Sequence, residues 1–196
     1  MYVVAFGDSA IVIDPCVHWE KTALTDLDVK AVLCTHGHFD HISTADELIS
    51  KFSCPCYIAK EDQEMLPDPR LNFAIDFGIQ VTVKQETVTF TKEEYSNLDF
   101  GIAEPFSLTV ISTPGHTEGS VCFLFETEDN KKYMFTGDML FERSVGRTDL
   151  GGSESDMKAS IQKLKAMDDS IRCYPGHGGE TVLGLEKKQN PYFLYF

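Results

Sequence analysis

The chain has 196 residues, 42% of them hydrophobic, and a formal net charge of −14. Its length and apolar content suffice for one compact domain with a sizeable core, and no repeat or linker divides it. The acidic charge should repel a polyanion, so we expect a small substrate and no nucleic acid. No apolar run approaches the roughly 20 residues of a membrane helix. The N-terminus also lacks the features of a signal peptide, so we expect a cytoplasmic protein without membrane contact.

Alternating or continuous apolar stretches predict eight strands. In chain order these lie at 2–6, 10–13, 30–34, 56–59, 106–112, 120–126, 132–136 and 171–174. Helices are expected over 44–52, near 60–66 and near 155–167. Thr44 and Glu47 would form a capping box on the first of these. Strand-rich halves with interspersed helices indicate an α/β fold.

The helix near 155–167 is amphipathic, with a buried face of Met157, Ile161 and Leu164. The densest basic group of the chain, Lys158, Lys163 and Lys165, lies on its other side, where we expect a solvated face. The segment 67–104 is harder to interpret. It contains several phenylalanines among scattered acidic residues, and it forms either a lid over a site or surface structure.

The six cysteines lie mostly in apolar, strand-like contexts. We therefore expect buried, reduced thiols in a reducing compartment. Cys54-Pro55-Cys56 invites a redox or metal interpretation. One intervening residue is poor spacing for a disulfide within the chain, however, so we interpret it as the start of a strand.

Half of the six histidines lie in the run His36-Gly37-His38-Phe39-Asp40-His41, directly after the apolar stretch 31–34. Alternate residues of a turn that leaves a strand can converge, so His36 and His38 can share one cation. Asp40 and His41 lie one step further on and can reach a second cation. Imidazole and carboxylate ligands suit zinc, with iron, manganese or nickel as substitutes. The alternative is a solvated, histidine-rich turn.

Three further strand-like stretches end in the same way. Thr113-Pro114-Gly115-His116, Thr136-Gly137-Asp138 and Pro175-Gly176-His177 each place a ligand-type residue beside glycine. Glycine permits a sharp turn and a close approach of the backbone to a metal. Four such junctions carry five of the six histidines, which predicts a metal centre.

Together these motifs resemble the metallo-β-lactamase fold superfamily, over nearly the whole chain. The resemblance implies a four-layer αβ/βα sandwich formed as a single domain by residues 1–196. It implies two divalent metal ions, with zinc expected first and iron or manganese possible. The implied ligands are His36, His38 and His116 for the first ion, Asp40, His41 and His177 for the second, and Asp138 between the two. Asp14 resembles the supporting aspartate of the superfamily and would orient a ligand loop. Alternatively, Asp14 is a turn residue before Pro15.

Such a site would activate water. Two divalent ions bring a charge of +4 and Asp40 with Asp138 removes two, so +2 remains. One zinc ion already lowers the pKa of bound water to about 7. The expected nucleophile is a hydroxide held between the metals by their ligands, and no separate protein nucleophile is required.

Particular positions indicate the branch of the superfamily. The commonest two-zinc β-lactamases have cysteine in place of Asp138, and flavodiiron proteins have glutamate in place of His38, which argues against both. The stretches 135–141 and 146–149 are similar to glyoxalase II (hydroxyacylglutathione hydrolase) and to persulfide dioxygenases. The segment Pro175-Gly176-His177-Gly178 and Asn190-Pro191 resemble short bacterial glyoxalase II-like hydrolases.

These short enzymes lack a C-terminal helical glutathione-binding domain. The sequence given ends at residue 196, 19 positions after His177, and we expect no such domain. Arg147 matches a basic position that contacts glutathione in the family; the alternative is a surface salt bridge. Asp149 and Gly179 stand where the long enzymes carry tyrosines, so thioester hydrolysis is expected without a strict requirement for glutathione.

The expected function is therefore a binuclear metal-dependent hydrolase, a thioesterase of glyoxalase II type that cleaves small 2-hydroxyacyl thioesters. One alternative is an iron-dependent persulfide dioxygenase with a single His-His-Asp iron site. Another is a non-catalytic metal-binding module. The sequence predicts no particular oligomeric state.

Overall fold

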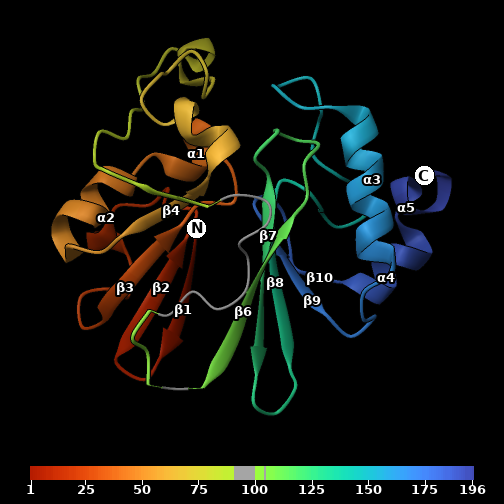
Figure 1. Ribbon diagram of the computed structural model, residues 1–196, viewed down its shortest axis with the longest axis horizontal. Coiled ribbons are helices and arrows are strands. Elements are labelled where there is room, and N and C mark those ends of the chain that lie inside the picture. Colours follow the sequence, from red (N-terminus) through yellow and green to blue (C-terminus); the bar gives the residue numbers. More distant parts are fainter. Residues whose placement is uncertain (91–99, 104) are drawn as a thin grey trace. The chain divides into compact units, whose positions relative to one another are not determined.

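The computed structural model describes residues 1–90, 100–103 and 105–196 (Figure 1). The chain forms two compact units. Of the described residues, unit 1 comprises 1–90 and 100–103, and unit 2 comprises 105–196. Each unit contains one five-stranded sheet with its own helices.

The sheet of unit 1 has the strand order β1-β2-β3-β4-β5. Its strands are β1 (Tyr2–Phe6), β2 (Ser9–Ile13), β3 (Asp28–Leu33), β4 (Cys56–Ala59) and β5 (Val88–Phe90). β1 pairs with β2 in antiparallel fashion, whereas β2, β3, β4 and β5 pair in parallel. The carboxyl ends of β2 and β3 therefore meet at the same edge of this sheet.

Short helices connect the strands of unit 1. They are η1 (Trp19–Lys21), α1 (Phe39–Ile42), α2 (Ala45–Phe52), η2 (Lys60–Met65) and η3 (Ala74–Phe77). Ala45 and Leu48 of α2 are fully buried in a cluster with strand residues such as Val32 and Ile58. Unit 1 therefore has a hydrophobic core of its own.

The capping box expected on α2 is wrong. Thr44 precedes the helix, but its side chain makes no cap hydrogen bond and donates instead to the Val17 carbonyl oxygen. The Glu47 carboxylate accepts from the backbone N–H of Trp19 and contacts the His18 ring. Tertiary partners on the 17–19 segment thus replace the local cap.

The sheet of unit 2 has the strand order β10-β9-β8-β7-β6. Its strands are β6 (Phe106–Ser112), β7 (Val121–Thr127), β8 (Lys132–Gly137), β9 (Arg172–Pro175) and β10 (Thr181–Val182). β7 is antiparallel to both β6 and β8, and β9 is parallel to β8. Strands β6, β8 and β9 therefore run in the same direction and end at the same edge.

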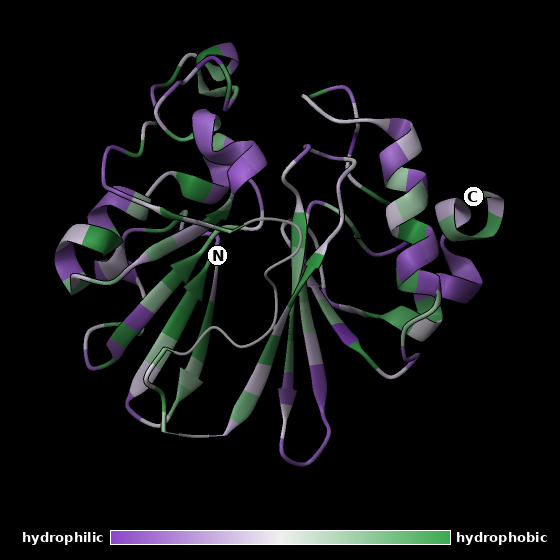
Figure 2. Cartoon of the chain, in the orientation of Figure 1, coloured by the Kyte–Doolittle hydropathy of each residue, from purple (hydrophilic) through white to green (hydrophobic). Residues whose placement is uncertain are grey.

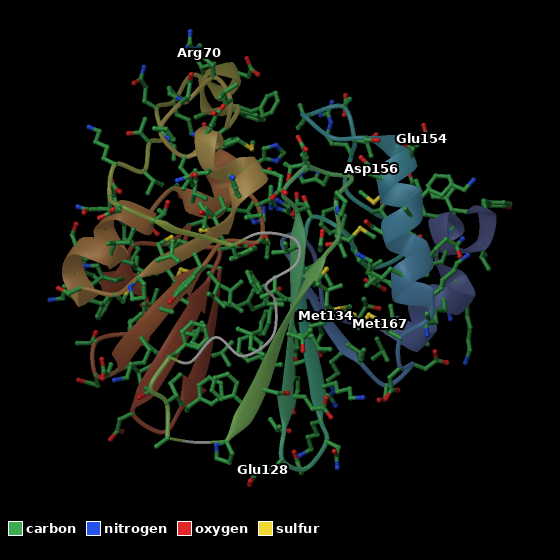
Figure 3. The ribbon with its side chains drawn as sticks, in the orientation of Figure 1. Arg70, Glu128, Met134, Glu154, Asp156 and Met167 are labelled. Carbon is green, nitrogen blue, oxygen red and sulfur yellow. The ribbon has the colours of Figure 1, made fainter. Side chains whose placement is uncertain are left out.

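The described residues of unit 2 form the helices α3 (Glu154–Lys165), α4 (Leu183–Gln189) and α5 (Pro191–Tyr195). The Ser153 hydroxyl caps α3 by accepting from the backbone N–H of Asp156, and acidic side chains occupy the first turn, where Figure 3 labels Glu154 and Asp156. The expected face of Met157, Ile161 and Leu164 is buried. It packs in one cluster with Met134 of β8 and Met167 beyond the helix end (Figure 3).

All eight predicted strands and the helices α2 and α3 are confirmed within two residues at each end, and the helix near 60–66 is the 3₁₀ helix η2. Figure 2 shows that apolar residues dominate much of the strands, as their sequence pattern predicts. All six cysteines are reduced, and five are buried. The described residues include no helix that is both long and apolar enough to cross a membrane. Residues 91–99 and 104 of the segment 67–104 lie outside the described residues.

Candidate metal centre

The residues expected to bind metal fall into two groups, one in each unit. His36, His38, Asp40 and His41 follow the carboxyl end of β3 in unit 1, and Asp14 follows the neighbouring end of β2. His116, Asp138 and His177 follow the ends of β6, β8 and β9 in unit 2. Within each sheet, these strands run parallel and present their ligand-type residues at one edge.

In unit 1 the imidazoles lie close together. The ring centroids of His36 and His38 are 4.7 Å apart, and those of His36 and His41 are 4.1 Å apart. His36 offers a ring nitrogen within 4.8 Å of one from each of these neighbours. The Asp40 carboxylate lies 3.8 Å from His41 Nε2. All three rings are buried.

Asp14 organises this group. Its Oδ2 accepts from His41 Nδ1 at 2.9 Å and from the Thr35 hydroxyl at 2.8 Å, and its Oδ1 accepts from the Thr35 backbone N–H at 2.7 Å. Because the Thr35 hydroxyl donates its proton to Asp14, its oxygen accepts from His36 Nδ1 at 3.0 Å. Asp14 therefore orients His41 directly and His36 through Thr35.

The backbone of Asp14 is in the left-handed region, at φ 51°. Such a conformation costs free energy for a residue other than glycine and is maintained by surrounding structure. Here the carboxylate and its three donors hold it in place. Thr35 was not anticipated from the sequence, although its position directly before His36, at the end of an apolar strand, was an available signal.

In unit 2 the Asp138 carboxylate lies between two imidazoles. Its Oδ2 is 3.5 Å from His116 Nε2 and 3.5 Å from His177 Nε2. Two ligand atoms of a tetrahedral zinc ion are about 3.3 Å apart. These spacings thus fit shared coordination. His116 is buried, whereas 56% of the His177 side chain is exposed.

Glycines allow the close packing around His116. Gly115 has φ 147°, and a Cβ there would lie 2.5 Å from Met157 Cα of helix α3. A Cβ on Gly146 would lie 1.9 Å from the Asp138 carbonyl oxygen and 3.0 Å from His116 Nδ1. The chain next to Gly146 also fixes the ring, because the Arg147 carbonyl oxygen accepts from His116 Nδ1 at 2.7 Å.

The Arg147 side chain is engaged elsewhere. Its guanidinium makes a two-point contact with Asp149, from Nε to Oδ1 at 2.6 Å and from Nη2 to Oδ2 at 2.5 Å. Hydrogen bonding to Arg147 lowers the pKa of the Asp149 carboxyl to about 2. Both side chains are more than 60% exposed. A contact of Arg147 with a substrate carboxylate would therefore have to compete with Asp149.

Three of the histidines have an acceptor at Nδ1, which makes Nε2 their metal-binding nitrogen. A carbonyl or carboxylate oxygen can only accept, so His116 and His41 donate from Nδ1, and the neutral form of each ring has its lone pair on Nε2. His36 likewise donates from Nδ1, because the Thr35 hydroxyl uses its own proton for Asp14 and can only accept from the ring. Neutral imidazoles together with carboxylates form the donor set of zinc, iron and manganese sites. The residues therefore fit divalent transition-metal ions.

A protein-family model described as the metallo-beta-lactamase superfamily matches residues 1–177. The chain belongs to this superfamily. The expected fold is confirmed with it: two mixed sheets flanked by helices, as in the αβ/βα sandwich of the superfamily. Metal binding and hydrolase chemistry are general features of the superfamily members that the chain resembles.

Curated superfamily members resemble the chain along nearly their whole length. The probable metallo-hydrolase YqgX of Bacillus subtilis is 34% identical, with 100% of this chain and 92% of the relative covered. Hydroxyacylglutathione hydrolase GloC of Haemophilus influenzae is 32% identical, with 94% and 87% covered.

Solved structures of other proteins are similar in fold to this chain. The BLEG-1 B3 metallo-beta-lactamase has a TM-score of 0.86 and 34% identity, with 97% of this chain and 92% of that chain covered. A protein in a di-iron-bound form has a TM-score of 0.78 and 29% identity, with 97% and 93% covered. ETHE1 of Myxococcus xanthus has a TM-score of 0.72 and 25% identity, with 97% and 77% covered.

Proposed function

We propose that the chain is a two-metal thioesterase that hydrolyses small 2-hydroxyacyl thioesters. The ligands of this proposal are those implied by the superfamily resemblance: His36, His38, Asp40, His41, His116, Asp138 and His177. The observation that carries it is the hydrogen bond at Nδ1 of three of these histidines, accepted by Thr35, Asp14 and the Arg147 carbonyl, which directs Nε2 of each neutral ring to a metal. The similarity to hydroxyacylglutathione hydrolase GloC supports the thioester as substrate.

Two divalent ions would supply, when bound, a hydroxide from water near neutral pH and polarisation of the substrate carbonyl. The protein's own residues hold the ligand rings in place and keep protons off the coordinating nitrogens. A thiolate leaves readily, so no general acid is needed for the leaving group.

Three of the buried cysteines, Cys34, Cys54 and Cys122, do not provide an alternative nucleophile. Burial raises the pKa of Cys122 to about 12 and that of Cys54 to about 11. A hydrogen bond with Cys56, together with burial, raises the pKa of Cys34 well above its ordinary value. Such thiols are protonated at neutral pH and weakly reactive. Their reduced state supports a cytoplasmic location, which is part of this proposal.

An iron-dependent persulfide dioxygenase is the second candidate. It is favoured by the structural similarity to ETHE1, and the similarity to a di-iron protein leaves iron open as the metal. The similarity to BLEG-1 adds β-lactam hydrolysis as an activity to assay, although Asp138 argues against the commonest β-lactamase type.

The experiment combines metal analysis with three assays on protein purified without oxygen. We expect two metal ions per chain and hydrolysis of the lactoyl thioester of N-acetylcysteamine without oxygen. Asp138→Ala should lose metal and activity, whereas Asp129→Ala, an exposed change in the same unit, should retain both. Oxygen consumption with glutathione persulfide and no thioester cleavage would overturn the proposal. So would cleavage of a β-lactam in place of the thioester.

A further inference from the structure

Residues 66–83 of unit 1, called here the apolar loop, expose an unusual number of large hydrophobic side chains. Leu71, Ile75, Phe77 and Ile79 are each at least 44% exposed, and Phe77 reaches 69%. The loop includes η3, and Figure 2 shows apolar residues in this part of the chain, near the tip where Figure 3 labels Arg70. Exposed large apolar side chains gathered in one short segment are typical of a binding surface.

The apolar loop is held in a fixed shape by a buried asparagine. Asn72 is 0% exposed, and its Nδ2 donates to the carbonyl oxygens of Met65 and Val81. Its Oδ1 accepts from the backbone N–H of Ala74. A hydrogen bond from the Val83 N–H to the Leu66 carbonyl closes the loop. The surface is therefore formed before any ligand binds.

The apolar loop is also continuous with the histidine motif. The Asn72 carbonyl oxygen accepts from the backbone N–H of Phe39, at the start of α1. The Phe73 ring meets the His38 ring edge-on, with centroids 5.2 Å apart, and the Phe77 ring contacts Phe39 at 4.9 Å. Apolar surface thus extends from a proposed metal ligand outward to Phe77.

Phe73 makes its contact from a strained backbone. Its φ of 66° lies in the left-handed region, which is unusual for a bulky side chain. Strain of this kind persists only where surrounding structure enforces it, and it is concentrated at functional sites. Here Asn72 fixes the residues on both sides.

We propose that the apolar loop binds an aliphatic or aromatic group that the substrate carries beside its reacting carbonyl. This inference rests on the proposed function and narrows its substrate class to thioesters with an apolar substituent. The contact between Phe73 and His38 favours a substrate over a macromolecular partner, because it places apolar surface against a residue of the reaction site. A second copy of the chain would bring the same charge of −14 and be repelled.

The test compares two substrates with the same thiol. These are the N-acetylcysteamine thioesters of lactate, with a methyl group, and of mandelate, with a phenyl ring, assayed on the zinc-loaded protein. We expect kcat/KM to be about tenfold higher for the mandeloyl ester, a typical gain for apolar burial in a pocket. Phe77→Ser and Ile75→Ser should each bring the ratio of kcat/KM for the mandeloyl and lactoyl thioesters toward one.

Val88→Ser is the matched control, because Val88 is 47% exposed in the same unit but lies on β5. It should leave the ratio unchanged. Since Phe77 and Ile75 are largely exposed, their substitution should not impair folding, which the thermal midpoint checks. A second arm varies the thiol, with lactoyl thioesters of N-acetylcysteamine and of benzyl thiol. If the benzyl thioester has the higher kcat/KM and Phe77→Ser removes this preference, the proposal is supported and the apolar group that the loop binds belongs to the thiol.

Calorimetric titration with free mandelate and lactate separates this inference from the proposed function, because it requires no turnover. If no thioester is cleaved but mandelate binds more tightly in a Phe77-dependent manner, the thioesterase assignment fails and the apolar site stands. Equal rates and equal affinities for both probes, unchanged by Phe77→Ser, would overturn the site. It would also be overturned if the wild type were a dimer that Phe77→Ser converts to a monomer with unaltered selectivity.

Discussion

At the scale of single residues, Asp14 has the widest influence on the histidines of unit 1. Its Oδ2 accepts from both His41 Nδ1 and the Thr35 hydroxyl. The amide of an asparagine at this position would keep one oxygen to accept from the Thr35 backbone N–H. Its NH₂ group, however, would face the other two donors, His41 Nδ1 and the Thr35 hydroxyl. His41 would then have to move its proton to Nε2, where it blocks coordination.

Asp14→Asn should therefore lower metal affinity by about 10–100-fold, the usual effect of removing such an orienting partner. Asparagine tolerates the left-handed backbone of this position, so the fold should persist. Competition with a chelator measures the affinity, and imidazole ¹⁵N shifts report the tautomer of His41. Asp28→Asn, an exposed change in the same unit, is the control. Unchanged affinity with an unchanged tautomer would contradict the orienting role.

Arg147 and Asp149 give a second prediction for individual residues. Hydrogen bonding to the Arg147 guanidinium lowers the pKa of Asp149 to about 2. In an NMR titration, Asp149 should therefore remain ionised until the pH approaches 2. In Arg147→Ala its midpoint should rise toward the ordinary value of about 3.9. If the titration midpoint of Asp149 stays low in Arg147→Ala, a group other than Arg147 stabilises the ionised carboxylate.

The same pair bears on the thiol carrier. If Arg147 binds a carboxylate of the carrier, Asp149 competes for it, so Asp149→Asn should lower KM for a glutathione thioester. Arg147→Ala should raise that KM and should have far less effect with N-acetylcysteamine, which has no carboxylate. Equal effects on the two carriers would assign Arg147 to a structural role.

At the scale of elements, helices α4 and α5 support the loop that fixes His116. The Glu186 carboxylate is 1% exposed and accepts from the Arg143 N–H, the Thr181 hydroxyl and Asn190 Nδ2. Asn190 also donates to the Ser144 carbonyl oxygen. Arg143, at φ 56°, begins the stretch that leads to the Arg147 carbonyl. The C-terminal helices thus hold the backbone that orients a ligand ring.

Glu186→Ala should lower the free energy of unfolding by about 3 kcal/mol, because it leaves buried donors without acceptors. Glu186→Gln keeps part of the acceptor capacity, so its free energy of unfolding should lie between those of the wild type and of Glu186→Ala. Glu180→Ala, at an exposed position of the same unit, should change stability by no more than about 0.5 kcal/mol. Urea unfolding measures all three. An alanine variant as stable as the wild type would show that the network carries no net stabilisation.

The elements that the sequence predicted well are those with a strong local signal. Apolar alternation located the long strands, such as β6 and β7, and the amphipathic pattern located α3. Strands β5 and β10 have three and two residues, too few for any periodicity. Helix α1 has only four residues, three of them inside the histidine motif. The Thr44 cap failed because Glu47 bonds instead to the 18–19 backbone and side chain, a contact that no local pattern encodes.

The candidate site divides in the same way. Histidine and aspartate beside glycine at strand ends are visible in the sequence, so the ligand-type residues could be proposed. Their supporting contacts are not visible, because they join residues far apart in the chain. Thr35 is 21 positions from Asp14, and the Arg147 carbonyl is 31 from His116. The sequence does not indicate the role of the apolar loop, because the loop's shape depends on Asn72, whose contacts only the fold reveals.

At the scale of the whole molecule, metal binding should be coupled to folding. The proposed ligands are spread along the sequence from His36 to His177, and a site that is absent from the unfolded chain contributes its binding free energy to the folded state. An ion present at a thousandfold excess over its dissociation constant stabilises by about 4 kcal/mol. For a chain of this length, each kcal/mol raises the melting temperature by about 2–4 °C.

We therefore expect zinc-loaded protein to melt about 10 °C above protein stripped by a chelator, as measured by scanning calorimetry. Asp138→Ala should melt at the same temperature with and without zinc, because this carboxylate is proposed to contact both ions. Asp129→Ala, exposed on the surface of unit 2, should show the full difference. Zinc that binds stoichiometrically to the wild type without raising its melting temperature would bind the unfolded chain equally well. Coordination by residues that only the fold brings into place would then be ruled out.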